Sequence, residues 1–435
     1  MNIPNAHTRS AVLDPAFGAG GEVDLDHVLN TQDVTLINVY SALVLPDNSI
    51  IISVDIRAGI TRGPGLIKLT PAGELCTEFG NGTGYVLECY PDDLDAYGLG
   101  LTLADDGHLL SFADCFRPKG YDHVVGCTRY TETGERDPSF NNDGRIIVGD
   151  FPLLTVDQHQ PYAAKNDEHF ELHRSSLAVE VEKGSVTFNF TYATLYNERE
   201  HSYLVRLTAE GKLDQTFHDR GFTDVLYEGN PMRIWGMTRY QDQGWVLSGS
   251  LQDYALVARV SHDGTLDEHF GDPATPGFLR IEEGVFMGFN NALITANHHI
   301  IVVGYRQRTG RPHPSDGCIL KLDAHGRIDP DFIPTYHTVN EQRMMFRFIA
   351  ATLTAGEFWV GATLVIFDEN TFTTQGILGR FLLNGSPDNN FGTNGYWSVP
   401  DSISLTSLTV QPNGKCLITY RAQGNSASRV QRYLP

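Results

Sequence analysis

Short apolar runs recur along the whole chain and are separated by glycine, asparagine, aspartate and proline. Three such runs stand in each stretch of about 60 residues, as in YSALVL, DNSIIISV and GLIKL near the N-terminus. Runs that are rich in β-branched and aromatic residues and end at turn-forming residues are typical of β-strands. No long segment has the periodicity of an amphipathic helix. The pattern therefore predicts an all-β protein.

A repeated motif follows the third run of each stretch and consists of a base, a glycine, an aspartate and a phenylalanine. The seven phenylalanines are Phe17, Phe79, Phe140, Phe217, Phe270, Phe332 and Phe391. Their spacings are 62, 61, 77, 53, 62 and 59 residues, and the step from Phe391 through Pro435 back to Phe17 is again 61 residues. A repeat that closes on itself across the chain ends predicts a ring.

The other motif positions keep fixed distances from the phenylalanine. Eleven residues before it stands a base in six copies: Lys68, Arg129, Arg206, Arg259, Lys321 or Arg380. The seventh base, Arg432, stands at the C-terminus, and its phenylalanine, Phe17, lies at the other end of the chain. Six residues before it stands a glycine: Gly73, Gly134, Gly211, Gly264, Gly326 or Gly385. Three residues before it stands an aspartate, except for Cys76 in the second copy: Asp14, Asp137, Asp214, Asp267, Asp329 or Asp388. We expect the glycine to supply positive φ in a turn, the aspartate to accept backbone N–H bonds, and the phenylalanine to be buried.

The segment after each phenylalanine adds a fourth strand to the three runs of each repeat. Seven such repeats predict a seven-bladed β-propeller of four-stranded antiparallel blades. The C-terminal SRVQRYLP is predicted to be the third strand of the last blade, and residues 1–30 to complete that blade by pairing an N-terminal strand with it. Residues 1–435 are therefore interpreted as a single propeller domain, closed without an exposed sheet edge at the seam.

The phrases RLTAEGKLDQTFHDRGF, RVSHDGTLDEHFG, LLNGSPDNNFGTNG and QPNGKCLIT resemble the delta-60 repeat found in many bacterial proteins. The resemblance covers essentially the whole chain and implies a β-propeller whose shared residues are scaffold residues. It implies no particular biochemical activity. Three features depart from the repeat pattern: Cys76 in place of aspartate, FIPTYH without a trailing glycine in the sixth copy, and a long third repeat.

The net charge of −21 argues against nucleic acid as a partner and against binding to an anionic membrane. The N-terminal MNIPNAHTRSAVLDPAF lacks the apolar core of a secretory signal peptide, and no segment approaches the length of a transmembrane helix. We therefore predict a cytoplasmic protein, or one exported without a conventional signal peptide. None of the six cysteines forms a C-x-x-C pair or a zinc pattern. Cys115 and Cys127 could face each other across a hairpin, although reduced, partly buried thiols are the simpler interpretation.

In a propeller, the connections from strand two to strand three and from strand four to the next blade share one face. Here these connections vary in length and composition, so we predict that this variable face is the working surface. Its loops are rich in arginine and also contain acidic residues; the basic and aromatic residues include Arg57, Arg62, Arg117, Tyr121, Arg306 and Arg308. Arginine on an acidic protein suggests recognition of a carboxylate, a phosphate or an acidic protein surface, and the alternative is ordinary solvated loop charge.

The third repeat is extended by the segment GDFPLLTVDQHQPYAAKNDEHFELHRSS. Within it His169, Glu171 and His173 alternate, and in an extended conformation all three side chains would point the same way. Together they could hold a divalent metal ion. In a helix, His169 and His173 would come together and Glu171 would turn away, and surface histidines without a ligand are the third interpretation.

Residues near the starts of the innermost strands are predicted to line the channel mouth: Tyr97, Arg174, Arg233, Trp235, Asn290, Arg343 and Arg347. They could clamp an acidic or sugar ligand, or the aromatic rings could pack between blades. The leading hypothesis is a non-catalytic binding module that presents the variable face to a protein or glycan partner and needs no cofactor. The alternatives are a lectin and an enzyme, the latter a metal-assisted hydrolase or lyase at the channel mouth. The sequence contains no nucleophile elbow, P-loop or H-E-x-x-H motif.

Overall fold

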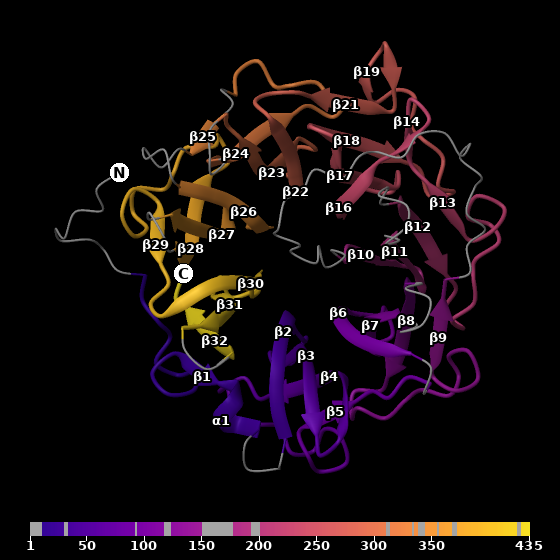
Figure 1. Cartoon of the computed structure of the whole chain (residues 1–435), viewed down its shortest axis with the longest axis vertical. Helices are drawn as coiled ribbons and strands as arrows, with labels where there is room; N and C mark the ends of the chain where they lie inside the picture. Colours follow the sequence, from indigo (N-terminus) through magenta and orange to yellow (C-terminus); the bar gives the residue numbers. More distant parts are fainter. Residues whose placement is uncertain are drawn as a thin grey trace.

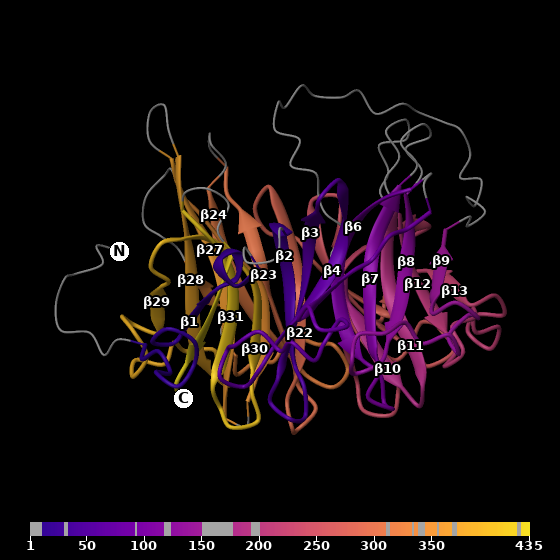
Figure 2. The ribbon, with the colours of Figure 1, turned by 90° about the horizontal axis from the view of Figure 1, so that it is seen from below.

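A computed structural model of the chain describes residues 11–29, 34–91, 94–116, 123–149, 177–192, 201–309, 314–332, 335–337, 344–354, 356–367, 372–423 and 428–435. Its strands form seven four-stranded antiparallel sheets arranged as blades around a central axis (Figure 1). Edge-on, the strands of every blade run between the two faces of the ring (Figure 2). The predicted all-β, seven-bladed propeller is confirmed.

The first four blades follow one another along the chain. Blade 1 consists of β2 (Val34–Val44), β3 (Ile50–Ala58), β4 (Thr61–Leu69) and β5 (Tyr85–Leu87). Blade 2 consists of β6 (Asp95–Leu103), β7 (Leu109–Phe116), β8 (His123–Tyr130) and β9 (Arg145–Val148). Blade 3 consists of β10 (Val179–Glu182), β11 (Ser185–Tyr192), β12 (His201–Leu207) and β13 (Phe222–Asp224). Blade 4 consists of β16 (Arg233–Arg239), β17 (Trp245–Leu251), β18 (Tyr254–Val260) and β21 (Phe278–Ile281).

The remaining three blades complete the ring. Blade 5 consists of β22 (Phe286–Ile294), β23 (Ile300–Gln307), β24 (Ser315–Leu322) and β25 (Thr335–His337). Blade 6 consists of β26 (Met344–Leu353), β27 (Glu357–Phe367), β28 (Phe372–Leu382) and β29 (Tyr396–Ser398). Blade 7 consists of β30 (Ser402–Val410), β31 (Cys416–Ala422), β32 (Ser428–Tyr433) and β1 (Glu22–Asp24). The short elements outside the blades are α1 (Leu25–Leu29), β14 (Leu226–Tyr227), β15 (Asn230–Pro231), β19 (Gly271–Asp272) and β20 (Thr275–Pro276).

The two ends of the chain meet in blade 7, as the closing step of the repeat predicted. β1 pairs antiparallel with β32, with Val23 opposite Val430, and Figure 1 shows the indigo strand beside the yellow one. The Arg432 guanidinium lies 2.7 Å from the Asp14 carboxylate, across the seam. A strand from the N-terminus therefore completes the last blade.

The repeated phenylalanine joins each blade to the next one. Phe270 of blade 4 is 1 % exposed, and its ring lies against Gly326 in the motif of blade 5. Gly326 has φ of 77°, and a Cβ there would lie 2.5 Å from the ring. The same contact recurs at Phe17–Gly73, Phe79–Gly134, Phe140–Gly211, Phe217–Gly264 and Phe332–Gly385. The glycine is therefore required both for its backbone conformation and for the ring of the preceding blade.

The repeated base makes a second connection between blades. Arg259 forms an ion pair of 2.7 Å with Asp267 in its own motif and donates a hydrogen bond of 2.6 Å to the Ala324 carbonyl of blade 5. Its guanidinium also lies 5.0 Å from the centroid of the Phe270 ring. Arginines at the same position in other blades repeat this pattern, to the carbonyls of Ala209, His262 and Pro71. The motif therefore holds neighbouring blades together.

All six cysteines are free thiols in the structure. Cys115 lies opposite Val124, and Cys127 lies opposite Phe112, so the two cysteines do not face each other across the hairpin, in line with the simpler interpretation of reduced thiols. Burial raises the pKa of both thiols well above the ordinary range, which keeps them in the unreactive protonated form. Among the described residues, no helix has the length and apolar character needed to cross a membrane.

Candidate functional site

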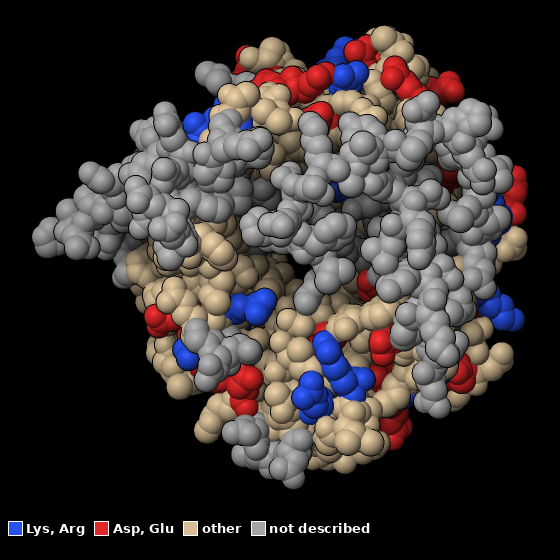
Figure 3. Space-filling view, in the orientation of Figure 1, with Lys and Arg blue, Asp and Glu red and all other residues tan. Residues whose placement is uncertain are grey.

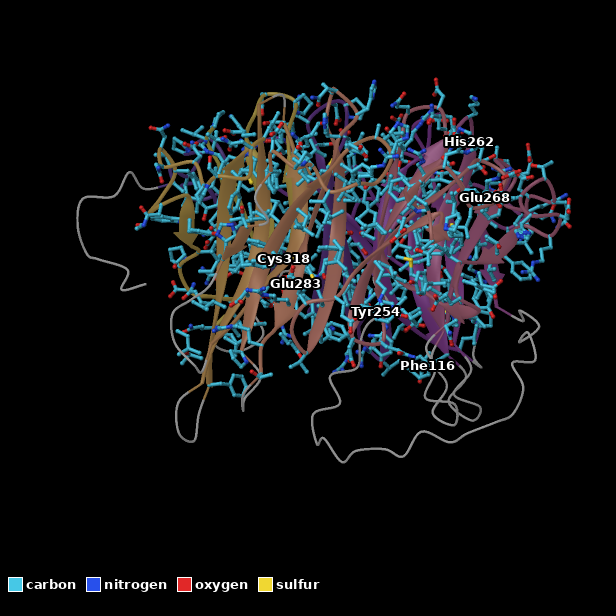
Figure 4. All side chains as sticks on the ribbon, turned by 90° about the horizontal axis from the view of Figure 1, so that it is seen from above. Phe116, Tyr254, His262, Glu268, Glu283 and Cys318 are labelled. Carbon is cyan, nitrogen blue, oxygen red and sulfur yellow. The ribbon has the colours of Figure 1, made fainter. Side chains whose placement is uncertain are left out.

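The propeller has two faces that the sequence builds differently. On one face, which we call the turn face, a five-residue turn joins strands one and two. In five blades the first residue of this turn donates its backbone N–H to the carbonyl of the fifth: Leu45 to Ser49, Ala104 to His108, Tyr240 to Gly244, Thr295 to His299 and Gln411 to Lys415. The repeated motif of base, glycine, aspartate and phenylalanine lies on this face as well. On the variable face, the β3–β4 turn has two residues, whereas residues 193–200 join β11 to β12. Phe116 and His262 mark the variable and turn faces, respectively, in Figure 4.

Seven of the residues predicted to bind a ligand or metal lie outside the described residues: Arg117, Tyr121, His169, Glu171, His173, Arg174 and Arg343. Arg347 belongs to β26, but its side chain is not described. Within the described ranges, no group of three or more histidine, cysteine, aspartate or glutamate side chains could hold a metal ion. The metal site in the long third repeat therefore remains a prediction.

Arg233 and Trp235 lie at the start of β16, on the variable face. The Trp235 ring is stacked on Tyr305 of blade 5 at 6.1 Å between centroids, and Tyr305 is stacked in turn on Phe286. Trp235 also fills the space beside Gly288 of blade 5. The Arg233 guanidinium lies 6.0 Å from the Trp235 ring. This geometry corresponds to the alternative in which the aromatic rings pack between blades.

Arg306 and Arg308, at the variable-face end of β23, both lie close to the buried carboxylate of Asp316. Arg306 lies 3.3 Å from one oxygen and Arg308 lies 3.1 Å from the other. Asp316 has no exposed side-chain surface, so the two arginines compensate a charge that would otherwise be buried alone. Arg306 also forms an ion pair of 2.9 Å with Glu283. A ligand that bound these arginines would therefore compete with the Asp316 and Glu283 carboxylates for them.

A second polar cluster joins blade 1 to blade 2 and was not predicted. The buried Asp55 carboxylate accepts hydrogen bonds from the Gly98 amide at 2.8 Å and from the Tyr40 hydroxyl. Burial raises the pKa of Asp55, while these donors and the nearby Arg62 act in the opposite direction. The only signal in the sequence is an aspartate inside the apolar run IIISVDI.

The β3–β4 hairpin projects Arg57, Ile60 and Arg62 from the variable face of blade 1. Arg57 lies directly opposite Arg62, and the turn residues between the strands are Gly59 and Ile60. Both arginines are exposed, and Ile60 is exposed at 103 %. Arg62 stacks on Tyr97 of blade 2 at 4.8 Å, and no described carboxylate forms an ion pair with either arginine. Figure 3 shows basic side chains gathered over this part of the face.

A cavity of about 280 Å³ lies elsewhere, at the seam between blades 6 and 7. Its lining is mainly apolar and consists of Ala11, Val12, Leu13, Trp397, Pro400, Gln431 and Tyr433. None of the predicted ligand-binding residues contributes to it. We therefore centre the candidate site on the exposed side chains of the variable face.

No protein-family model matches the sequence, and no curated protein matches it. Among solved structures, a protein of unknown function from Dyadobacter fermentans is similar over 95 % of this chain and 97 % of its own, with 10 % identity and a TM-score of 0.41. The Pyrococcus horikoshii acylaminoacyl peptidase is similar over 93 % of this chain and 52 % of its own, with 9 % identity and a TM-score of 0.42. The Bacillus subtilis levansucrase is similar over 96 % of this chain and 85 % of its own, with 10 % identity and a TM-score of 0.33. These likenesses concern the fold alone, and the delta-60 resemblance stays a prediction.

Proposed function

We propose that the protein is a non-catalytic binding module that holds a protein partner on its variable face. The observation that carries the proposal is the position of the most exposed large apolar side chains. Ile60 is exposed at 103 % and Phe372 at 66 %, more than any other large hydrophobic residue among those described. Ile60 lies in the turn between strands two and three of blade 1, and Phe372 begins strand three of blade 6, so both lie on the variable face. Exposed apolar side chains beside arginines are typical anchors of protein interfaces.

The way the fold uses its arginines supports the same surface. On the turn face, the motif arginines are held in ion pairs, and Arg259 and Arg432 have side chains only 6 % exposed. Arg57 and Arg62 are exposed and lie on the variable face. The motif arginines therefore hold neighbouring blades together on the turn face, whereas Arg57 and Arg62 form no ion pair with a described carboxylate and are available to a partner.

The test compares the two ends of β28, because Phe372 begins this strand on the variable face and Leu382 ends it on the turn face. Both side chains are exposed, at 66 % and 40 %. A photo-crosslinking amino acid is placed at either position, and the full-length protein is irradiated in an extract of its source cells. We expect one discrete protein to be crosslinked from position 372 and not from position 382. Equal labelling from both positions, or labelling from position 382 alone, would contradict the proposal.

A further inference from the structure

We propose that the tip of the β3–β4 hairpin is the docking element itself, and that it fits an apolar pocket rimmed by carboxylates on a partner protein. The tip consists of Arg57, Ile60 and Arg62, with Gly59 in the turn. This inference rests on the proposed function, because it names the part of the variable face and the chemistry of the partner. Three properties of the tip carry it.

The first property is that folding does not need an apolar residue at position 60. Gly59 has φ of 61° and, of the two turn residues, is the only one with positive φ. A type II′ hairpin turn requires positive φ only at the first central residue, which glycine supplies. Ile60 itself is exposed at 103 % and therefore buries no surface against its own chain. None of the described residues covers this isoleucine, so we infer that a partner buries it.

The second property is the pair of like charges behind the tip. Arg57 and Arg62 are directly opposed across the two strands, an arrangement that destabilises a hairpin because the guanidinium groups repel each other. Arg62 is held in place by stacking on Tyr97 at 4.8 Å, which fixes its guanidinium beside the tip. Carboxylates of a partner would remove the repulsion and accept charge-assisted hydrogen bonds from both groups.

The third property is the charge around the tip. The nearby Asp55 and Glu88 carboxylates are buried, and Glu88 is already bound by Arg136 and Arg145. Asp95, at the start of β6, is exposed and can form part of the rim of the interface. The basic tip therefore stands out on a chain whose net charge is −21.

The same overall charge selects the class of partner. A chain with a net charge of −21 is repelled by anionic lipid and by nucleic acid, so the two arginines are poorly placed to bind either. One isoleucine is also too small an apolar surface to hold a protein on a bilayer. A protein pocket with carboxylates around its entrance would bury the Ile60 side chain and would also pair with the Arg57 and Arg62 guanidinium groups.

The β17–β18 hairpin provides a matched control within the same molecule. It also turns in two residues, Gln252 and Asp253, and it lies on the same face, but its tip is polar. The test measures binding of the purified protein that position 372 crosslinks, by calorimetry, to the full chain and to Ile60→Ser, Arg57→Glu/Arg62→Glu and Asp253→Ala variants. Vesicles that contain phosphatidylserine and a panel of acidic oligosaccharides are the additional probes. Thermal unfolding of every variant is measured in parallel.

We expect Ile60→Ser to weaken binding of the crosslinked protein by roughly tenfold or more, because burial of this side chain is lost. The double charge reversal should weaken binding further and reverse its dependence on salt, because the new carboxylates repel those of the partner, whereas Asp253→Ala should bind like the parent. Unchanged binding by the tip variants would overturn this inference and leave the variable face as the interface. Binding to the vesicles or oligosaccharides in place of the protein would overturn it as well. A failure of position 372 to crosslink any protein would instead remove the proposed function.

Discussion

Replacing Phe270 by alanine tests whether the repeated phenylalanine fastens one blade to the next. The ring is 1 % exposed and lies between the Arg259 guanidinium of its own blade and Gly326 of blade 5. Its burial is worth about 1.5–3 kcal/mol. Removal of the ring leaves a cavity of roughly 100 Å³, which adds roughly 2 kcal/mol at about 24 cal/mol per Å³. We therefore expect the free energy of unfolding to fall by about 3–5 kcal/mol.

The assay is guanidinium-induced unfolding, followed by tryptophan fluorescence. Phe372→Ala is the matched control, since this phenylalanine is 66 % exposed and should change the free energy of unfolding by less than about 0.5 kcal/mol. Gly326→Ala probes the same contact from the other blade, because its Cβ would lie 2.5 Å from the Phe270 ring. If Phe270→Ala unfolds at the same denaturant concentration as Phe372→Ala, the fastening role of the motif is refuted.

Two further predictions concern a partly buried carboxylate and the seam. Burial raises the pKa of Glu180 to about 6, so the charged carboxylate destabilises the folded protein. This loss of folding stability is absent below about pH 4, where the group is protonated in both states, and is complete above about pH 6. Glu180→Gln should therefore be more stable than the parent by about 1–2 kcal/mol at pH 8, a difference that vanishes towards pH 4 in urea titrations. Deletion of residues 1–24 removes β1 and Asp14 from blade 7 and should yield insoluble protein; a soluble, monomeric truncation would contradict the closure.

The ring could be predicted from the sequence because its signal is repeated in every blade. The step from Phe391 back to Phe17 matches the other spacings, and this alone indicates that β1 completes blade 7. The partner of each phenylalanine could not be predicted in the same way. Spacing within a repeat is the same whether the ring packs in its own blade or, as Phe270 does, against the next one.

The variable face was harder to predict because each of its contacts occurs once. Arg306 and Arg308 look like free loop arginines in the sequence, and only the fold brings them to the buried Asp316. Trp235 has no periodic partner that would reveal its stacking on Tyr305 across the blade boundary. Ile60 belongs to an ordinary two-residue turn, and its full exposure depends on where the hairpin ends relative to blade 2.

The central claim is that arginines on the turn face stabilise the fold, whereas Arg57 and Arg62 on the variable face do not. The most direct test is the thermal unfolding midpoint of single arginine-to-alanine variants. One set is Arg129, Arg206, Arg259, Arg380 and Arg432, whose side chains pair with the motif aspartates on the turn face. The other set is Arg57 and Arg62 on the variable face. Loss of one partner of a buried ion pair costs about 3–5 kcal/mol, so the first set should melt several degrees below the parent. The second set should melt with the parent, and an equal fall for Arg57→Ala or Arg62→Ala would show that the fold, and not a partner, requires these arginines.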